Sequence, residues 1–277
     1  MLPPYVLFDL DDTLFDHTRA SRIALAAIHE AHADDVNFDI FVHEHARVLE
    51  VYHLRFLRGE LTLDQARAAR MIELFAAFEK TITTTDALAI ATLYRREHQG
   101  NRALVEGARD LLEALQQQTQ LGIVTNNATA EQIEKLRALN IAHFFDTIVI
   151  SEDVGVTKPD RRIFEIALER LGARPTEVVM VGDSLSADIE GAANAGITSV
   201  WLNRKKDQTP SGADVNSQKC LKSLAIAGVS ISEPIELISL TPTANTLAAI
   251  KAAFQKYSPS TLATKDITHA NLETLAS

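Results

Sequence analysis

The stretch "YVLFDLDDTLFD", residues 5–16, decides the fold because it joins a buried strand to a cluster of acids. The apolar run over residues 5–8 is long enough for a strand that is covered on both faces. Asp9, Asp11 and Asp12 follow this run directly. Carboxylates this close raise one another's pKa, so the cluster is costly unless a cation or a proton-transfer task makes use of it.

From residue 107 onward, helix and strand patterns alternate, which is typical of a parallel sheet with crossover helices. The predicted strands are residues 121–125, 147–150, 177–182 and 198–202, and the predicted helices are residues 107–118, 128–140, 159–172 and 186–196. With residues 5–8 these make five buried parallel strands. Residues 234–240 are a candidate edge strand, and residues 244–257 a candidate helix. The sequence therefore predicts an α/β fold.

A block of helices interrupts this pattern between residues 18 and 98. Apolar positions three and four apart predict helices over residues 21–33, 40–57, 63–80 and 86–96. Thr62 and Gln65 fit a capping box that opens the third helix, and Gly59 fits the end of the second. We expect a discontinuous catalytic core at residues 1–16 and 99–250, a helical cap at residues 17–98 and a flexible tail at residues 258–277.

Composition restricts the partners of the chain. Its 277 residues are 46% hydrophobic and carry a formal charge of −10. An acidic chain without a basic patch is a poor match for nucleic acid polymers or an anionic membrane, whereas a small anionic substrate can still bind beside local cations. The single cysteine, Cys220, excludes an intramolecular disulfide. No leader or membrane-spanning stretch is visible, so the expected location is the cytoplasm.

Polar side chains follow four of the predicted strands, at the edge of the sheet where ligands bind in open parallel sheets. In chain order they are Asp9 and Asp11, Thr125 and Asn126, Lys158, and Asp183. Each has a simpler interpretation: Asp183 and Ser184 could cap a helix, Thr125 could close a strand, and Lys158 could be solvated. Their occurrence together at corresponding strand ends favours one functional site.

The chemistry of this set favours phosphoryl transfer. Several carboxylates suit Mg²⁺, and Asp9 and Asp183 are the natural direct ligands. A metal between them would keep Asp9 ionised as a nucleophile, while Lys158 and Thr125 would hold the phosphoryl oxygens. Asp11, two residues beyond Asp9 and on the same face of an extended segment, is left for proton transfer.

Four segments resemble, in order, the motifs of the haloacid dehalogenase superfamily. They are "DLDDT", "IVTN", "KPD" and "VGDSLSAD", and the resemblance covers residues 5–202. It implies a Rossmann-like core with a helical cap inserted after the first motif. It also implies that Asp9 forms an aspartyl-phosphate and that Asp11 is the general acid and then the base. Thr125, Asn126 and Lys158 would bind the phosphoryl group, with Lys158 also steadying Asp9.

The same resemblance implies a Mg²⁺ site. Asp9, the backbone carbonyl of Asp11, and Asp183 would hold the ion, with Asp188 in support through a metal-bound water. Asp11 argues for a phosphatase, because the dehalogenase branch lacks this second carboxylate. Asp12 stands where a Gly is often found, and it is expected only to help start the turn towards the cap.

Within the phosphatases, the sequence around the motifs is similar to that of bacterial pyrimidine 5′-nucleotidases, which act on nucleoside monophosphates. The segments concerned are "LFDLDDTLFD", "SEDVGVTKPDRRIFEIALERLG" and "VGDSLSADIEGAANAGI". The alternatives are a phosphatase of sugar phosphates or phosphoglycolate, a phosphomutase with the same Asp pair and, less favoured, a haloacid dehalogenase. A mere binding module would be expected to lack one of the site residues, and none is lacking.

The histidines of the helical block do not predict a metal site. His43 and His45 lie two apart on a predicted helix and so point to different sides, while His29 and His32 miss the two-His metalloprotease spacing. All four are expected to be partly exposed helix residues.

Overall fold

The structure is a computed structural model that describes residues 2–204, 235–237 and 250–252. Its centre is a six-stranded, fully parallel sheet with the order β3-β2-β1-β4-β5-β6. The strands are β1 (Tyr5–Phe8), β2 (Gln120–Thr125), β3 (Thr147–Ile150), β4 (Val178–Gly182), β5 (Thr198–Leu202) and β6 (Ile235–Leu237). The predicted Rossmann-like sheet is confirmed, and the candidate edge strand forms as β6.

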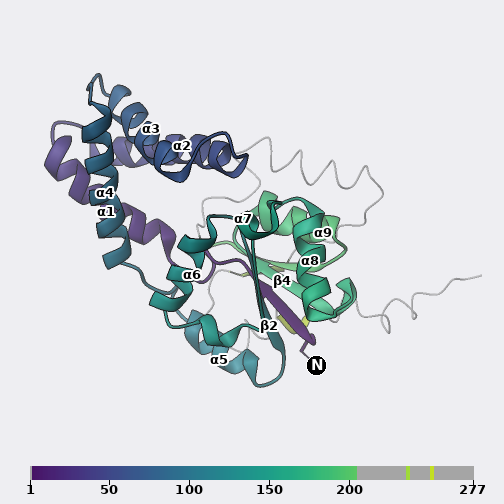
Figure 1. Cartoon of the computed structure of the whole chain (residues 1–277). Helices are drawn as coiled ribbons and strands as arrows, with labels where there is room; N and C mark the ends of the chain where they lie inside the picture. Colours follow the sequence, from purple (N-terminus) through teal and green to yellow (C-terminus); the bar gives the residue numbers. More distant parts are fainter. Residues whose placement is uncertain (1, 205–234, 238–249, 253–277) are drawn as a thin grey trace, which may run out of the picture.

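Strand β1 occupies the middle of the sheet. Tyr5 is paired in register with Gln120 of β2 on one side and with Val178 of β4 on the other. Because all strands are parallel, their carboxyl ends lie along one edge, and β1 runs towards helices α6 and α1 (Figure 1). The residues that follow β1, β2 and β4 are therefore brought together at this edge.

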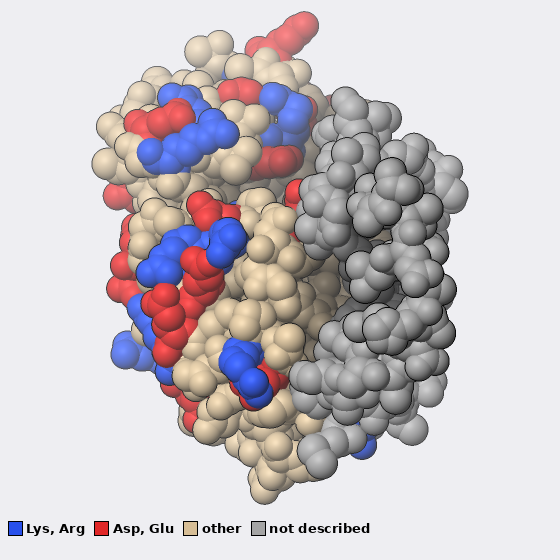
Figure 2. Space-filling view, turned by 90° about the vertical axis from the view of Figure 1, so that its right-hand side faces the viewer, with Lys and Arg blue, Asp and Glu red and all other residues tan. Residues whose placement is uncertain are grey.

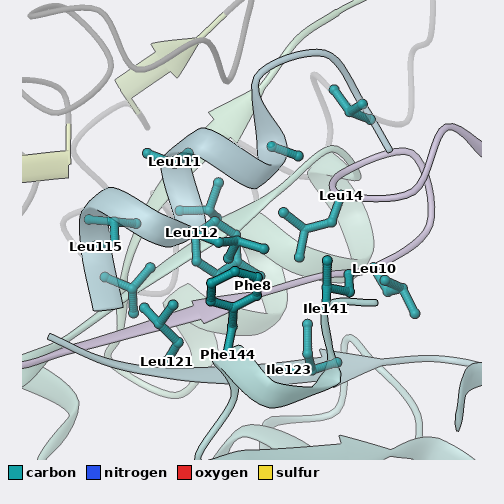
Figure 3. Packing of buried hydrophobic residues seen from close by; sticks show 14 of the residues in the cluster. Phe8, Leu10, Leu14, Leu111, Leu112, Leu115, Leu121, Ile123, Ile141 and Phe144 are labelled. Carbon is teal, nitrogen blue, oxygen red and sulfur yellow. The ribbon is translucent and has the colours of Figure 1, made fainter. Parts of the chain in front are cut away.

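Helices cover both faces of the sheet. They are α5 (Ala108–Gln116), α6 (Thr129–Ala138), α7 (Ser151–Val154), α8 (Arg161–Leu171) and α9 (Gly191–Asn194), with short helical turns η1 (Ala142–Phe144), η2 (Pro175–Glu177) and η3 (Leu185–Glu190). Alternate residues of β1 face opposite sides. Phe8 packs against the leucines of α5 (Figure 3), whereas Leu7 belongs to a second cluster that includes Phe164 of α8.

Between β1 and β2 lies a block of four helices, α1 (His17–His32), α2 (Phe38–Leu57), α3 (Leu63–Ala76) and α4 (Thr84–Gly100). The block stands beyond the carboxyl ends of the strands (Figure 1) and has its own buried cluster around Phe41 and Met71. The predicted capping box of Thr62 and Gln65 forms, and Gly59 has a φ of 70° just after α2 ends. The expected helical insertion is therefore present, with each helix within a few residues of its predicted bounds.

Many exposed charged side chains form ion pairs with partners of opposite sign, such as Arg22 with Asp39 and Arg162 with Glu169. On the face drawn in Figure 2, Lys and Arg alternate with Asp and Glu and do not gather into a uniformly basic patch. No described helix has the length and the apolar character that crossing a membrane would require. The predicted tail at residues 258–277 and most of the predicted helix at residues 244–257 lie outside the described residues; residues 250–252 are helical.

Candidate active site

Three neighbouring strands place the first components of the site. Asp9 follows β1, and its N–H donates to the carbonyl of Val181, which extends the ladder between β1 and β4 by one residue. Thr125 is the last residue of β2, and Asp183 directly follows β4. The side chains of Asp9 and Thr125 are buried and that of Asp183 is half-buried, so the sheet delivers three polar groups into a largely dry edge.

Lys158 lies between two buried carboxylates. Its Nζ is 2.5 Å from Oδ1 of Asp9 and 2.6 Å from Oδ1 of Asp188. Burial alone would lower the pKa of Lys158, but the charges of Asp188 and Asp9 outweigh it and hold this pKa above its ordinary value. Lys158 therefore remains a cation and holds the Asp9 carboxylate by an ion pair.

The side chain of Asn126 holds the backbone of Lys158. Its Nδ2 donates to the carbonyl of Lys158 at 3.0 Å, and its Oδ1 accepts the Lys158 N–H at 2.8 Å. Both polar atoms are thereby engaged. The side chain of Asn126 therefore positions Lys158, and the role of Asn126 in phosphate binding stays a prediction.

Asp9, Asp183 and Asp188 form an acidic cluster in which one oxygen from each carboxylate lies within 4.8 Å of the others. Burial raises the pKa of both Asp9 and Asp183, and the charges of neighbouring carboxylates add to this effect. A divalent cation would offset the cost of burying these carboxylates next to one another. The donor set therefore fits the expected hard cation with oxygen ligands.

The two oxygens of Asp188 are already engaged within this cluster. Oδ1 accepts from Lys158, and Oδ2 accepts the N–H of Ser184 at 2.9 Å. Asp9 and Asp183 are therefore better placed to bind an ion directly, and Asp188 to support them. Asp188 can lie in this position because residue 182 is a glycine. A Cβ at residue 182 would lie 2.4 Å from Cγ of Asp188.

Asp11 lies on the other side of the site, in an ion pair with Lys135 of α6. The Lys135 Nζ is 2.6 Å from Oδ1 and 2.8 Å from Oδ2. Burial would raise the pKa of Asp11, but the positive charge of Lys135 outweighs it and holds that pKa below its usual range. Asp11 is therefore held as a carboxylate.

Gln132 connects Asp11 with Thr125. Its Nε2 donates to Oδ2 of Asp11 at 3.2 Å and to Oγ1 of Thr125 at 2.6 Å. Because Oγ1 accepts from Gln132, the Thr125 hydroxyl keeps its own proton to donate into the site. Gln132 and Lys135 were not predicted as site residues, since the sequence pattern places them only on a helix. A signal was present: they lie three apart, on one face, in the helix directly after Thr125.

The contacts of Asp12 and His45 can be compared with the roles expected for them. Asp12 accepts the backbone N–H and the hydroxyl of Thr18 at 2.8 and 2.7 Å, so it shapes the entry to α1, as expected. The expectation for His45 is wrong, since this side chain is only 2% exposed. His45 packs on the ring of Tyr94, with 5.2 Å between centroids, because the helical block folds over that face of α2.

Comparisons with known proteins agree with this arrangement. The model of the haloacid dehalogenase-like hydrolase family matches residues 4–196. The putative HAD-hydrolase YfnB of Bacillus subtilis is 32% identical over 199 residues, covering 72% of this chain and 83% of its own. A crystal structure of YfnB bound to magnesium has a TM-score of 0.69 at 27% identity, over 90% of this chain and all of that one.

Two further relatives carry phosphatase names. The ribulose-1,5-bisphosphate 5-phosphatase of Halopiger xanaduensis is 34% identical over 73% of this chain and 85% of its own. The pyrimidine 5′-nucleotidase PynA of Streptococcus pneumoniae is 30% identical over the same shares of the two chains. With its strand-end acids and Lys158 in these positions, this chain belongs to the haloacid dehalogenase-like hydrolase family.

Proposed function

We propose that this protein hydrolyses nucleoside 5′-monophosphates with the aid of Mg²⁺, by way of an aspartyl-phosphate on Asp9. The observation that carries the proposal is the convergence of Asp9, Lys158 and Asp183, with Asp11 as a second carboxylate two residues from the first. A dehalogenase would have no use for Asp11, whereas a phosphatase needs an acid at the leaving oxygen.

The chain's own groups account for the first half of the reaction. Asp9 attacks phosphorus, and the ester oxygen leaves. Lys158 keeps Asp9 oriented and, with the Thr125 hydroxyl, donates to the phosphoryl oxygens as their charge shifts. Bound between Asp9 and Asp183, with the backbone carbonyl of Asp11, Mg²⁺ would neutralise their charges and those of the phosphate.

Asp11 supplies and then removes a proton. It protonates the leaving ester oxygen, and in the second half of the reaction it deprotonates the water that attacks the aspartyl-phosphate. Since Lys135 holds Asp11 ionised, the first role requires this ion pair to loosen as the substrate enters and Asp11 to take up a proton from water before it protonates the ester oxygen. We propose that the helical block of residues 17–98 is a cap. It closes over the site while the ester oxygen leaves and excludes bulk water.

The nucleotide specificity is supported by the sequence around the motifs and by the similarity to PynA. The similarity to a ribulose bisphosphate phosphatase makes a sugar phosphate the second candidate substrate. A cap that returned the phosphoryl group to its substrate would instead make a phosphomutase. Phosphate release from nucleoside monophosphates, sugar phosphates and phosphoglycolate separates these candidates.

The test compares the wild-type protein with and without a chelator, and with Asp9→Asn. We expect Mg²⁺-dependent release, fastest with nucleoside monophosphates, and no turnover by Asp9→Asn although it stays folded. Activity that survives thorough chelation would contradict the mechanism. Near-full activity of Asp9→Asn would show that the nucleophile is another residue, while preference for a sugar phosphate would reject only the nucleotide specificity.

A further inference from the structure

A cavity lies between the helical block and the core, beside the proposed site. It holds about 120 Å³ and is bounded by α2, α3 and α4 on one side and by α6 on the other. Roughly 10–15 Å³ is enough for one water molecule, so the cavity can admit a larger group. Lys135 forms part of its wall and also contacts Asp11, so a leaving group that extends past this pair enters the cavity.

Aromatic rings form much of the cavity wall. Tyr52, His53 and Phe56 come from α2, and Tyr94 and His98 come from α4. Burial lowers the pKa of His53 to about 4 and that of His98 to about 3, so both imidazoles are neutral at neutral pH. Uncharged rings of this kind favour a flat group, which they can cover by stacking.

Arg70 adds one cation to this wall. It comes from α3, and its guanidinium carbon lies 5.1 Å from the ring centroid of Tyr94. Its Nε is buried and has no hydrogen-bond partner. Within the part of the chain that the structure describes, no carboxylate pairs with Arg70.

The other cations of the wall differ from Arg70, because each has an acidic partner. Arg67 and Arg95 both contact Glu131, at 2.7 and 3.2 Å, and Lys135 contacts Asp11. Arg70 is half-buried, and leaving its buried Nε without an acceptor is costly, so a ligand that supplies an acceptor recovers that cost. Arg70 is therefore the cation that is ready to bind a ligand.

We propose that Arg70 is the specificity-determining residue of this cavity, and that it donates to an in-plane carbonyl oxygen of a nucleobase stacked on the ring wall. This inference rests on the proposed nucleotidase function and names the class of base it takes. The planar guanidinium forms two parallel hydrogen bonds with suitably placed acceptors. Uracil, thymine, cytosine and guanine each carry a carbonyl oxygen in the ring plane and adenine carries none, so adenine nucleotides should be the poorest substrates.

The alternative occupant is a second anionic group, such as the carboxylate of phosphoglycolate. It would pair with Arg70 but would leave the rings of Tyr94 and Phe56 uncovered. The ring wall therefore favours the base, and the alternative becomes an outcome of the test.

The test uses Arg70→Met, which keeps an unbranched apolar stem and removes the donors, and Arg70→Lys, which keeps the charge and loses the planar fork. Arg96→Met is the matched control, because Arg96 lies on α4 with a side chain that is 73% exposed and pairs only with Glu97. Activity is read as the ratio of kcat/KM for uridine 5′-monophosphate to that for ribose 5-phosphate, which lacks the base. Calorimetry with uridine reads binding in the cavity without phosphate or metal.

We expect Arg70→Met to lower this ratio at least tenfold and to weaken uridine binding by a similar factor. Arg70→Lys should keep only part of the wild-type kcat/KM ratio and of the uridine affinity. Arg96→Met should change neither quantity. An unchanged ratio in a folded Arg70→Met protein would overturn the inference and leave the nucleotidase function standing. An Arg70-dependent preference for phosphoglycolate would also overturn it. A wild-type protein that hydrolyses no nucleotide would reject the nucleotidase function, and this inference with it.

Discussion

The ammonium group of Lys135 lies 2.6 Å from Oδ1 of Asp11, so a helix that follows β2 fixes a carboxylate that follows β1. The Lys135 side chain is 4% exposed, whereas that of Asp11 is 25% exposed. The lysine is therefore the anchored partner, and Asp11 is the one that can turn towards a substrate.

Replacing Lys135 should damage catalysis more than folding. In Lys135→Met, Asp11 loses its main contact and samples unproductive positions, and a displacement of about 1 Å can cost about 100-fold in rate. We expect kcat to fall between about 10-fold and 100-fold while the melting temperature stays within a few degrees. Arg137→Met, on an exposed position of the same helix, is the control. Unchanged kcat in Lys135→Met would show that Asp11 is positioned by other contacts.

Removing Lys158 should instead destabilise the fold. Lys158→Met leaves Asp9 and Asp188 as buried carboxylates without their shared cation, and breaking a buried pair in this way costs about 3–5 kcal/mol. Urea unfolding with a chelator present measures the loss. Arg161→Met removes only an exposed pair with Glu165 and should change the free energy of unfolding by less than about 1 kcal/mol. Equal stability of the two variants would contradict the buried pairing.

The metal-free protein should lose stability as the pH rises from 6.5 to 8.5. Burial raises the pKa of Asp9 to about 7 and that of Asp183 to about 8, so the folded state binds protons that the unfolded state has released. Their contribution is complete below the unfolded pKa near 4 and is lost as the pH passes the folded values. The loss between pH 6.5 and 8.5 should be about 2 kcal/mol.

Two controls accompany this pH measurement, made by urea unfolding with a chelator. His53 and His98 act in the opposite direction, because their pKa values are lowered in the folded protein. The unfolded state binds their protons near pH 6.5, so their contribution to stability rises with pH and becomes constant about one pH unit higher. Asp183→Asn removes one of the two raised groups and should flatten the pH dependence, as should saturating Mg²⁺ in the wild type. If neither Asp183→Asn nor Mg²⁺ alters the slope of the free energy of unfolding against pH, the titrating groups lie outside this acidic cluster.

Gly182 should tolerate no side chain. Gly182→Ala places a Cβ 2.4 Å from Cγ of Asp188, and the shift that relieves this contact costs about 1–3 kcal/mol. The same shift moves Asp188 away from Lys158, so Mg²⁺-dependent activity should fall as well. Gly100→Ala is the control, since no atom lies within 4 Å of a Cβ built there. The measurements are the urea midpoint and the rate of phosphate release.

The sequence predicted the fold closely because parallel strands leave a local signal. The runs at residues 147–150 and 198–202 match β3 and β5 to the residue, since burial on both faces demands continuous Val and Ile. The strand-end acids could be found for the same reason, because each is anchored to a strong strand pattern.

The partners of Asp11 could not be found in this way. Gln132 and Lys135 lie in a helix whose sequence also fits a solvent-facing role, and their burial depends on a β1 segment more than a hundred residues away. The burial of His45 and the unpaired state of Arg70 likewise depend on how the four helices pack together. Local spacing can place Gln132 and Lys135 on one face of a helix, but it does not show which face is buried or what that face contacts.

The central place of β1 has a consequence for how the chain assembles. Its partners β2 and β4 begin at residues 120 and 178, so β1 leaves the ribosome before either neighbour, and it has neighbours on both sides only after residue 178 has been made. The contacts of α1–α4 are close in sequence, and local contacts form fastest. The helical block can therefore fold during synthesis, whereas the acids after β1 gather into a site only when the later strands close around it.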